Sequence, residues 1–467
     1  MNQLPADCLN EIFKYLDEDK VVLQSTLLVN RLWSEISVRE LWKSIININT
    51  LIDCIPNESK EILRENGILI LTSKHPMFNY PSFCKSLSVN QLNYKIKQWL
   101  NRERERQSNS IQNFNDKLYL LTKEIFKLLM SQIYSLRKLE FTDYSPLKQN
   151  IIFTSYPGAK DCLNDLSVLH CDSDIYPEFY YQLSQICQNL QLLYVSFKKV
   201  ISNGLSDLIS VQNNLKYLYM FQYYDCKELT PDIITSLKKL PNTLTKLNIY
   251  GGDHYIPLSF ISNFKNLQEL ILSFRNIKSF EDFKLLQHVT FPQLYSLEFK
   301  YEHPRNELLM NFLENNGKNL KNFKFIKNDN NLLNLAIIKY CPNIRKLSGL
   351  TNNDTETLQM FFEGCQSLEI ITIYCKRGFS EKEIFDVIVK YSPKSFYELQ
   401  LNYLCDPISK IFPHELESFF IKWANRIPQK PLSLIIIDNG SYSSMRHGKN
   451  KNVIEKYVKL GIINIKK

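Results

Sequence analysis

One short pattern of apolar residues recurs along most of the chain and constrains its fold more than any other feature. An apolar residue is followed by two residues, a second apolar residue, one residue, and a third apolar residue. Twelve copies occur in order: Leu136/Leu139/Phe141, Leu166/Leu169/Cys171, Leu190/Leu193/Val195, Leu215/Leu218/Met220, Leu244/Leu247/Ile249, Leu267/Leu270/Leu272, Leu294/Leu297/Phe299, Leu320/Phe323/Phe325, Ile344/Leu347/Gly349, Leu368/Ile371/Ile373, Phe396/Leu399/Leu401 and Leu432/Ile435/Ile437. Eleven intervals separate Leu136 from Leu432, so the mean spacing is about 27 residues. A unit this short cannot bury an apolar face alone, so the copies must stack on one another.

The segments between the copies carry signals for helix starts. Thr230-Pro231-Asp232 offers an N-cap threonine with proline at the first helical position. Ser380-Glu381-Lys382-Glu383 forms a capping box ahead of an apolar run. The repeating unit is therefore predicted to be a short strand followed by a helix, and stacked units of this kind form a parallel sheet lined by helices.

Three copies are preceded by cysteine at the same place, as Cys187-Gln-Asn-Leu190, Cys341-Pro-Asn-Ile344 and Cys365-Gln-Ser-Leu368. These cysteines match no compact zinc spacing, so we expect buried thiols at helix ends. The pattern, its spacing and the cysteines together resemble the cysteine-containing class of leucine-rich repeats. The resemblance implies an α/β solenoid, a horseshoe with a concave parallel β-sheet and convex helices.

The first 45 residues do not carry the repeat and predict three short helices. The first begins at Pro5, the second covers residues 19–29, and the third begins near Asn30 or Arg31. One side of the first helix is a wide apolar stripe that includes Cys8, Leu9, Ile12, Phe13 and Leu16.

The landmarks of this segment follow a recognisable order: Leu4-Pro5, Leu9, Ile12-Phe13, Leu16, Leu28-Val29-Asn30-Arg31, Trp33 and Leu41-Trp42. This order resembles the F-box, with Cys8 as a small departure. The resemblance implies that the segment binds a Skp-type adaptor, and through it a cullin–RING ubiquitin ligase, while the repeats hold a protein substrate for ubiquitination and proteasomal degradation. The adaptor-binding residues that it implies are Leu4, Pro5, Leu9, Ile12, Phe13, Leu16, Val29 and Trp33.

A segment of about 45 residues is barely large enough to enclose its own core. We therefore expect the stripe to be partly internal packing and partly a docking surface, with Leu9 and Phe13 divided from Leu4, Pro5 and Ile12. An alternative is that these helices only cap the solenoid of a non-ligase scaffold, because terminal repeats need caps.

The strand residues that flank the inward leucines point to the opposite face of the sheet. Five aromatic residues at such positions are the candidate substrate contacts: Tyr194, Tyr217, Tyr219, Phe221 and Tyr250. Exposed aromatic residues on adjacent strands are typical of interface anchors. The alternative is that loops or the C-terminal tail cover these rings. Later copies predict a mixed-charge zone made by Glu298, Lys300, Lys324, Lys346, Glu398 and Gln400.

The predicted organisation has four parts: residues 1–45, the F-box-like segment; 46–132, a linker with degenerate first repeats and a polar loop near 101–116; 133–444, the solenoid; and 445–467, a basic cap or tail. The formal charge of +9 is concentrated in this tail. The tail lacks the dense basic runs of nucleic-acid-binding arms, so a solvated cap is the favoured interpretation and RNA binding the alternative.

Catalytic signatures are missing from the sequence. Glycine-rich phosphate loops, H-E-x-x-H and G-x-S-x-G do not occur, and the seven histidines are isolated from one another. We therefore expect a non-enzymatic protein without cofactor or metal. Because we find neither a run of 18 apolar residues nor a secretory signal, we expect no membrane partner, reduced cysteines, and a cytoplasmic or nuclear location.

Overall fold

The computed structural model describes residues 4–16, 19–70, 76–107, 113–142, 151–226, 228–328, 330–351, 355–375, 381–403, 411–427, 430–437 and 450–464. The chain divides into two compact units, Met1–Pro241 and Asn242–Lys467.

The first unit begins with the three predicted helices: α1 (Ala6–Lys14), α2 (Lys20–Thr26) and α3 (Arg31–Leu41). Polar N-caps fix the starts of two of them. The Asp19 carboxylate accepts a hydrogen bond from the Val22 amide, and the Asn30 side chain accepts one from the Trp33 amide. Pro5 stands at the N-cap of α1, so the helix begins one residue after the predicted start.

A helical connection then leads to the repeats. It contains α4 (Ile48–Asp53), α5 (Asn57–Glu65), the 3-10 helix η1 (Tyr80–Phe83), the short strand β1 (Ser86–Ser88), α6 (Val89–Gln107) and α7 (Phe114–Gln132). Residues 101–107, assigned by the sequence analysis to a polar loop, are the last two turns of α6. Their alternating arginine and glutamate residues are good helix formers, and this propensity outweighs their polarity.

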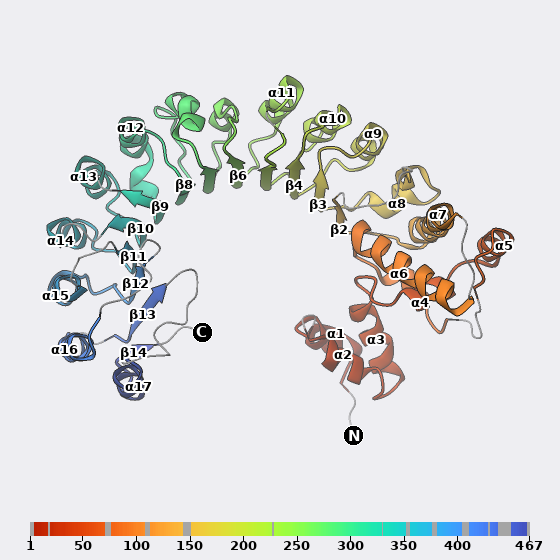
Figure 1. The fold of residues 1–467 in the computed structure, drawn as a ribbon, viewed down its shortest axis with the longest axis horizontal. Helices are drawn as coiled ribbons and strands as arrows, with labels where there is room; N and C mark the ends of the chain where they lie inside the picture. Colours follow the sequence, from red (N-terminus) through yellow and green to blue (C-terminus); the bar gives the residue numbers. More distant parts are fainter. Residues whose placement is uncertain are drawn as a thin grey trace. The chain divides into compact units, whose positions relative to one another are not determined.

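The remaining elements of the first unit alternate strand and helix. They are β2 (Lys138–Phe141), η2 (Phe153–Ser155), α8 (Ala159–Leu163), β3 (Val168–Asp172), α9 (Pro177–Ile186), β4 (Leu192–Phe197), α10 (Gly204–Ser210), β5 (Tyr217–Gln222) and α11 (Pro231–Lys239). Strands β1 to β5 pair in parallel and in chain order, and α8 to α11 lie along one side of β2 to β5 (Figure 1). The middle leucine of each pattern lies opposite the next: Leu87, Leu139, Leu169, Leu193 and Leu218.

The hydrogen-bonded ladder of the first unit starts directly after α3. The backbone amides of Lys85 and Ser86 both donate to the Lys43 carbonyl, and Ser44 forms a parallel bridge with Ser86. The same two-amide arrangement recurs one repeat later, where the amides of Arg137 and Lys138 both donate to the Lys85 carbonyl. The three helices are therefore joined to the sheet by the repeat's own hydrogen-bonding pattern.

The second unit continues the alternation. Its elements are β6 (Lys246–Gly252), η3 (Ser259–Asn263), β7 (Glu269–Phe274), η4 (Ile277–Leu285), β8 (Ser296–Tyr301), α12 (Asn306–Asn316), η5 (Gly317–Asn319), β9 (Asn322–Asn328), α13 (Asn331–Tyr340), β10 (Lys346–Thr351), α14 (Thr355–Gly364), β11 (Ile370–Tyr374), α15 (Glu381–Tyr391), β12 (Glu398–Asn402), α16 (Pro413–Ala424), β13 (Leu432–Ile437), α17 (Lys451–Lys459) and β14 (Ile463–Asn464). Strands β6 to β14 are also parallel and in chain order. The predicted α/β leucine-rich-repeat architecture is confirmed.

Two copies of the pattern depart from the sequence prediction. In β13 the ladder pairs Leu399 with Leu434, so Leu434 and Ile436 face the core, while Ile435 is only half-buried. The predicted register was wrong by one residue, and a shift of one residue moves every side chain to the opposite face of a strand. In β10 the third position is Gly349, but the register shifts between Ser348 and Leu350, so Leu350 lies opposite Ile373 and is buried in its place.

The three cysteines that precede repeat copies are completely buried at helix ends, as predicted. The Cys187 thiol donates to the Leu163 carbonyl at 3.0 Å, and the Cys365 thiol lies 3.8 Å from the Cys341 carbonyl. Each thiol therefore contacts the backbone of the preceding repeat. Burial raises the pKa of Cys187 to about 12 and that of Cys365 to about 11, so both stay protonated at neutral pH.

Candidate interaction surfaces

The three N-terminal helices enclose a small core of their own. Its buried members are Leu9, Phe13, Leu23, Ile36, Val38, Leu41 and Trp42. Phe13 meets Trp33 edge-to-face at 5.3 Å. Residues beyond the segment complete this core, because Trp42 packs on Tyr80 at 4.7 Å, and Phe78 and Phe83 close over the same side. Residues 78–83 of the same chain therefore supply part of the apolar packing that the short N-terminal segment cannot provide by itself.

The apolar stripe of α1 divides into a buried half and an exposed half. Leu9 and Phe13 are each 1% exposed, whereas Leu4 is 50% and Ile12 46% exposed. At about 100° per residue, Cys8, Ile12 and Tyr15 share one side of the helix, and Leu9, Phe13 and Leu16 lie next to it. The expected division between Leu9 and Phe13 on one side and Leu4, Pro5 and Ile12 on the other is confirmed. As core residues, Leu9 and Phe13 can support a docking surface but not touch a partner.

The other predicted adaptor contacts fall into the same two groups. Val29 is exposed in the turn after α2, next to Leu28, which is 88% exposed. Leu16 and Trp33 are half-buried and pack against the three-helix core. Val21 and Val22 on α2 are also exposed apolar residues. The segment thus presents apolar side chains from α1, from α2 and from the turn that follows α2, and exposed apolar residues in such number mark an interaction surface.

The open face of the first unit, defined as the strand positions that alternate with the buried leucines, carries a row of rings. His170, Tyr194 and Tyr219 occupy equivalent positions on β3, β4 and β5. Tyr194 lies 5.4 Å from His170 and is stacked on Tyr219 at 6.2 Å. Burial raises the pKa of Tyr194. The sequence analysis missed His170, although its place between Leu169 and Cys171 in the pattern puts it on this face.

The other predicted aromatic contacts lie beside this row or in the second unit. Tyr217 is exposed at the start of β5, and Phe221 near its end meets Tyr223 edge-to-face at 5.0 Å. Tyr250 belongs to β6, where it contacts Tyr301 at 6.3 Å. Tyr194, Tyr219, Phe221 and Tyr250 are half-buried and Tyr217 is exposed, so the open-face strands offer partly accessible rings to a partner.

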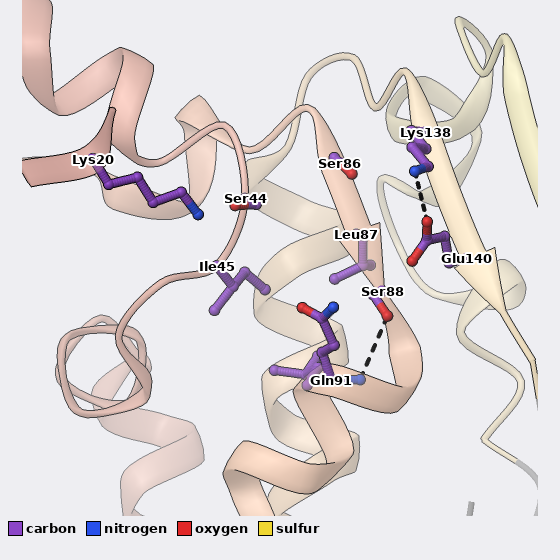
Figure 2. A pocket seen from close by; sticks show the side chains of 10 residues that line it. Lys20, Ser44, Ile45, Ser86, Leu87, Ser88, Gln91, Lys138 and Glu140 are labelled. Carbon is purple, nitrogen blue, oxygen red and sulfur yellow. Dashed lines mark hydrogen bonds and ion pairs between the residues drawn. The ribbon is translucent and has the colours of Figure 1, made fainter. Parts of the chain in front are cut away.

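A polar hollow of about 270 Å³ lies where the N-terminal helices meet the first strands (Figure 2). Lys20 of α2 extends toward Ser44, and Lys138 and Glu140 of β2 lie on the opposite side. The rest of the lining is polar Ser86, Ser88 and Gln91 and apolar Ile45, Leu87 and Leu92. Lys138 forms an ion pair with Glu140 at 2.6 Å, and Glu140 holds the open-face position next to His170. The hollow therefore adds hydrogen-bonding groups, not an apolar anchor, to the end of the aromatic row.

The predicted mixed-charge zone of the second unit needs one correction. Glu398 is buried, with its carboxylate accepting a hydrogen bond from the Gln400 side chain at 2.6 Å, so it is not available to a partner. Lys300, Lys324 and Lys346 remain accessible, and Lys324 is paired with Glu298 at 3.1 Å. The accessible charge is therefore more basic than the sequence analysis expected.

Neither surface contains the groups of a metal centre. Within the described ranges, no three side chains of histidine, cysteine, aspartate or glutamate gather in a metal-binding cluster. Among the helices that the structure describes, none has the length and apolarity needed to cross a bilayer.

Comparisons with known proteins give structural similarities only. No family model matches the chain, and no curated protein matches its sequence. One similar solved structure is the leucine-rich-repeat protein LegL7 from Legionella pneumophila, with a TM-score of 0.39 and 13% identity, over 68% of this chain and 96% of that one. Another is the Rad7 and Elc1 complex in yeast, with a TM-score of 0.39 and 16% identity, over 86% of this chain and 97% of that one.

Proposed function

We propose that the chain is a non-catalytic substrate-recognition subunit of a Skp–cullin–F-box ubiquitin ligase. The N-terminal helices would bind a Skp-type adaptor, and the open face of the repeats would hold a protein substrate for ubiquitination. The single observation that carries the proposal is the divided stripe of α1. Its buried half supports the three-helix core, while Leu4 and Ile12 stay exposed at positions that the F-box-like order marks.

The connection to the repeats suits this role. The chain leaves α3 and enters the ladder at Lys43 without a flexible linker, and the Lys95 ammonium also donates to the carbonyls of Ile45 and Ile46. A surface held this way would present a substrate bound on strands β2 to β5 at a defined position relative to the adaptor. Ubiquitin transfer itself would be the work of other subunits.

Co-purification with a Skp-type adaptor tests the proposal. The wild-type chain should capture the adaptor at low salt, and the triple variant Leu4→Ala, Pro5→Ala and Ile12→Ala should lose most of it. The matched control is Leu332→Ala with Leu335→Ala, since both leucines are exposed on α13 in the other unit. Failure of the wild-type chain to capture any adaptor, or equal losses in both variants, would contradict the proposal.

A second candidate function is a leucine-rich-repeat scaffold whose N-terminal helices serve as a cap. The ladder that begins at Lys43, and the closure of Tyr80 and Phe83 over the three-helix core, favour it. Hydrogen exchange separates the two candidates. Added adaptor should slow exchange in α1 if the segment docks an adaptor, and should leave it unchanged if the segment is only a cap.

A further inference from the structure

A diagonal line of four basic residues crosses the open face of the second unit. Lys346 on β10 pairs in register with Asn322, and Lys324 lies two residues further along β9. Lys324 pairs with Glu298, and Lys300 lies two residues further along β8. Lys300 pairs with Ser273, and Arg275 lies two residues further along the chain. From each basic residue to the next, the line thus moves to the neighbouring strand and two residues toward the C-terminal end of that strand.

The alternation of buried and accessible residues places these side chains on one face. Leu297, Phe299, Phe323, Phe325 and Leu347 are buried, so Lys300, Lys324 and Lys346 lie on the opposite side of their strands. Arg275 follows the end of β7, and its guanidinium contacts Tyr250, an open-face residue of β6. We call Arg275, Lys300, Lys324 and Lys346 the basic diagonal.

Two of the four basic residues on this diagonal have an acidic partner within the protein. Glu298 pairs with Lys324 at 3.1 Å, and Asp253 lies 4.0 Å from Arg275 with both side chains more than half exposed. Lys246 and Glu269, which also lie on this face, neutralise each other at 2.7 Å. The diagonal therefore keeps a net positive charge that is accessible to a partner.

Arg275 has the surroundings of an interface anchor. Its guanidinium lies over the Tyr301 ring at 5.4 Å and donates to the Tyr250 hydroxyl at 3.4 Å. Tyr301 has a φ of +76°, a left-handed conformation that is rare for an aromatic residue and is often found at functional positions. An arginine held between two tyrosines is the residue type and setting that dominates many interfaces, and its planar fork matches a carboxylate.

The spacing of the diagonal fits an extended peptide. A strand separation of about 4.8 Å and two residues of about 3.3 Å each give steps of about 8 Å. Side chains on one side of an extended peptide recur about every 7 Å, a difference that flexible lysines can absorb. The four basic residues, separated by three such steps, match four acidic residues at alternate positions of an octapeptide. Glu298 and Asp253 along the diagonal would repel the continuous phosphate charge of a nucleic acid, so the charge pattern favours a peptide with neutral residues between its carboxylates.

We propose that the basic diagonal binds an acidic, extended segment of a protein partner, with carboxylates at alternate residues. The inference rests on the proposed function in taking a protein substrate as the occupant. Arg275 anchors one end of the segment, and the three lysines select its remaining acidic side chains.

Fluorescence anisotropy with a labelled (Glu-Ser)4 peptide tests this inference on the full chain. The peptide should bind in low salt and weaken at least tenfold in 0.5 M NaCl, because exposed charges are screened. The variant Lys300→Glu, Lys324→Glu, Lys346→Glu should weaken binding at least tenfold. Its matched control, Lys318→Glu, Lys339→Glu, Lys390→Glu, reverses three charges on η5, α13 and α15 and should bind nearly as wild type. Thermal melts of both variants show whether each is folded.

Absence of peptide binding by wild type, or an equal loss in the control variant, would overturn the inference. Tighter binding of an eight-nucleotide oligothymidylate than of the peptide would overturn it in favour of nucleic acid. Adaptor capture is measured on the same samples, and reversal of the three lysines should leave it unchanged. If the wild-type chain captures the adaptor but does not bind the peptide, the diagonal alone is refuted. If it binds the peptide but captures no adaptor, the ligase role alone is refuted.

Discussion

The N-terminal helices and the repeats of this protein use apolar residues in different ways. In the repeats, the leucines of the pattern stack on their counterparts in the next unit and are almost completely hidden from water. In α1, by contrast, half of the apolar side remains exposed although a core lies directly beneath it. The difference shows that the exposed half is not required by the internal packing of this chain, and so needs another explanation.

The largest expected effect comes from a pair of substitutions on α1 itself. Leu9→Ala should destabilise the N-terminal helices by about 2–5 kcal/mol, because it leaves a cavity in their core. Ile12→Ala, three residues away on the exposed side, should change stability by no more than about 0.5 kcal/mol. Hydrogen exchange of the backbone amides of α1 to α3 measures both, because tryptophan fluorescence would also report Trp99 and Trp423. If both variants lost a similar amount of unfolding free energy, the division of the stripe into a core half and an exposed half would be contradicted.

A smaller effect is expected from the repeats. At Gly349 the φ of +128° is unfavourable for other residues, and an added Cβ would come within 2.3 Å of the Phe325 ring. Gly349→Ala should therefore destabilise the second unit by about 1–3 kcal/mol. Gly461→Ala is the control, since its φ of +69° is also left-handed but no atom lies within 4 Å of the added Cβ. A larger loss of melting temperature at Gly461 would contradict the packing explanation.

The architecture and the divided stripe could be predicted because each depends on local periodicity. Recurring leucines imply stacked strands, and a spacing of three or four residues separates Leu9 from Ile12 around a helix. Features that depend on strand register could not be predicted. The shift to Leu434, the burial of Glu398 and the diagonal placement of Arg275 relative to Lys300 arise only when neighbouring strands are paired. The backbone hydrogen bonds that join Lys43 to the first strand could not be predicted either, because no apolar residue of the repeat pattern marks this position.

The smallest expected effect concerns pH and is confined to the repeats, since residues 1–45 contain no histidine. Burial lowers the pKa of His170 below its ordinary value, Lys138 adds to this, and Glu140 opposes it. The unfolded chain therefore binds the proton more readily, and this contribution to stability is complete above about pH 6.5 and is lost as the pH falls toward the lower folded value.

His170→Gln should therefore make the free energy of unfolding less dependent on pH between 7.5 and 5.5. Urea unfolding at several pH values measures the change. The matched substitution His414→Gln on α16 controls for the removal of an exposed histidine elsewhere in the repeats. An unaltered slope in His170→Gln would show that the aromatic row does not disfavour the charged imidazole.

The central claim is that the exposed half of α1 is a docking surface for a Skp-type adaptor. Titration calorimetry of the purified chain with a purified adaptor tests it most directly, with wild type compared with Ile12→Asp and with Leu335→Asp as a similarly exposed control on α13. The account predicts saturable binding by wild type and by the control, and at least a tenfold weaker affinity for Ile12→Asp at unchanged melting temperature. Absence of binding by wild type, or full affinity in Ile12→Asp, would contradict it.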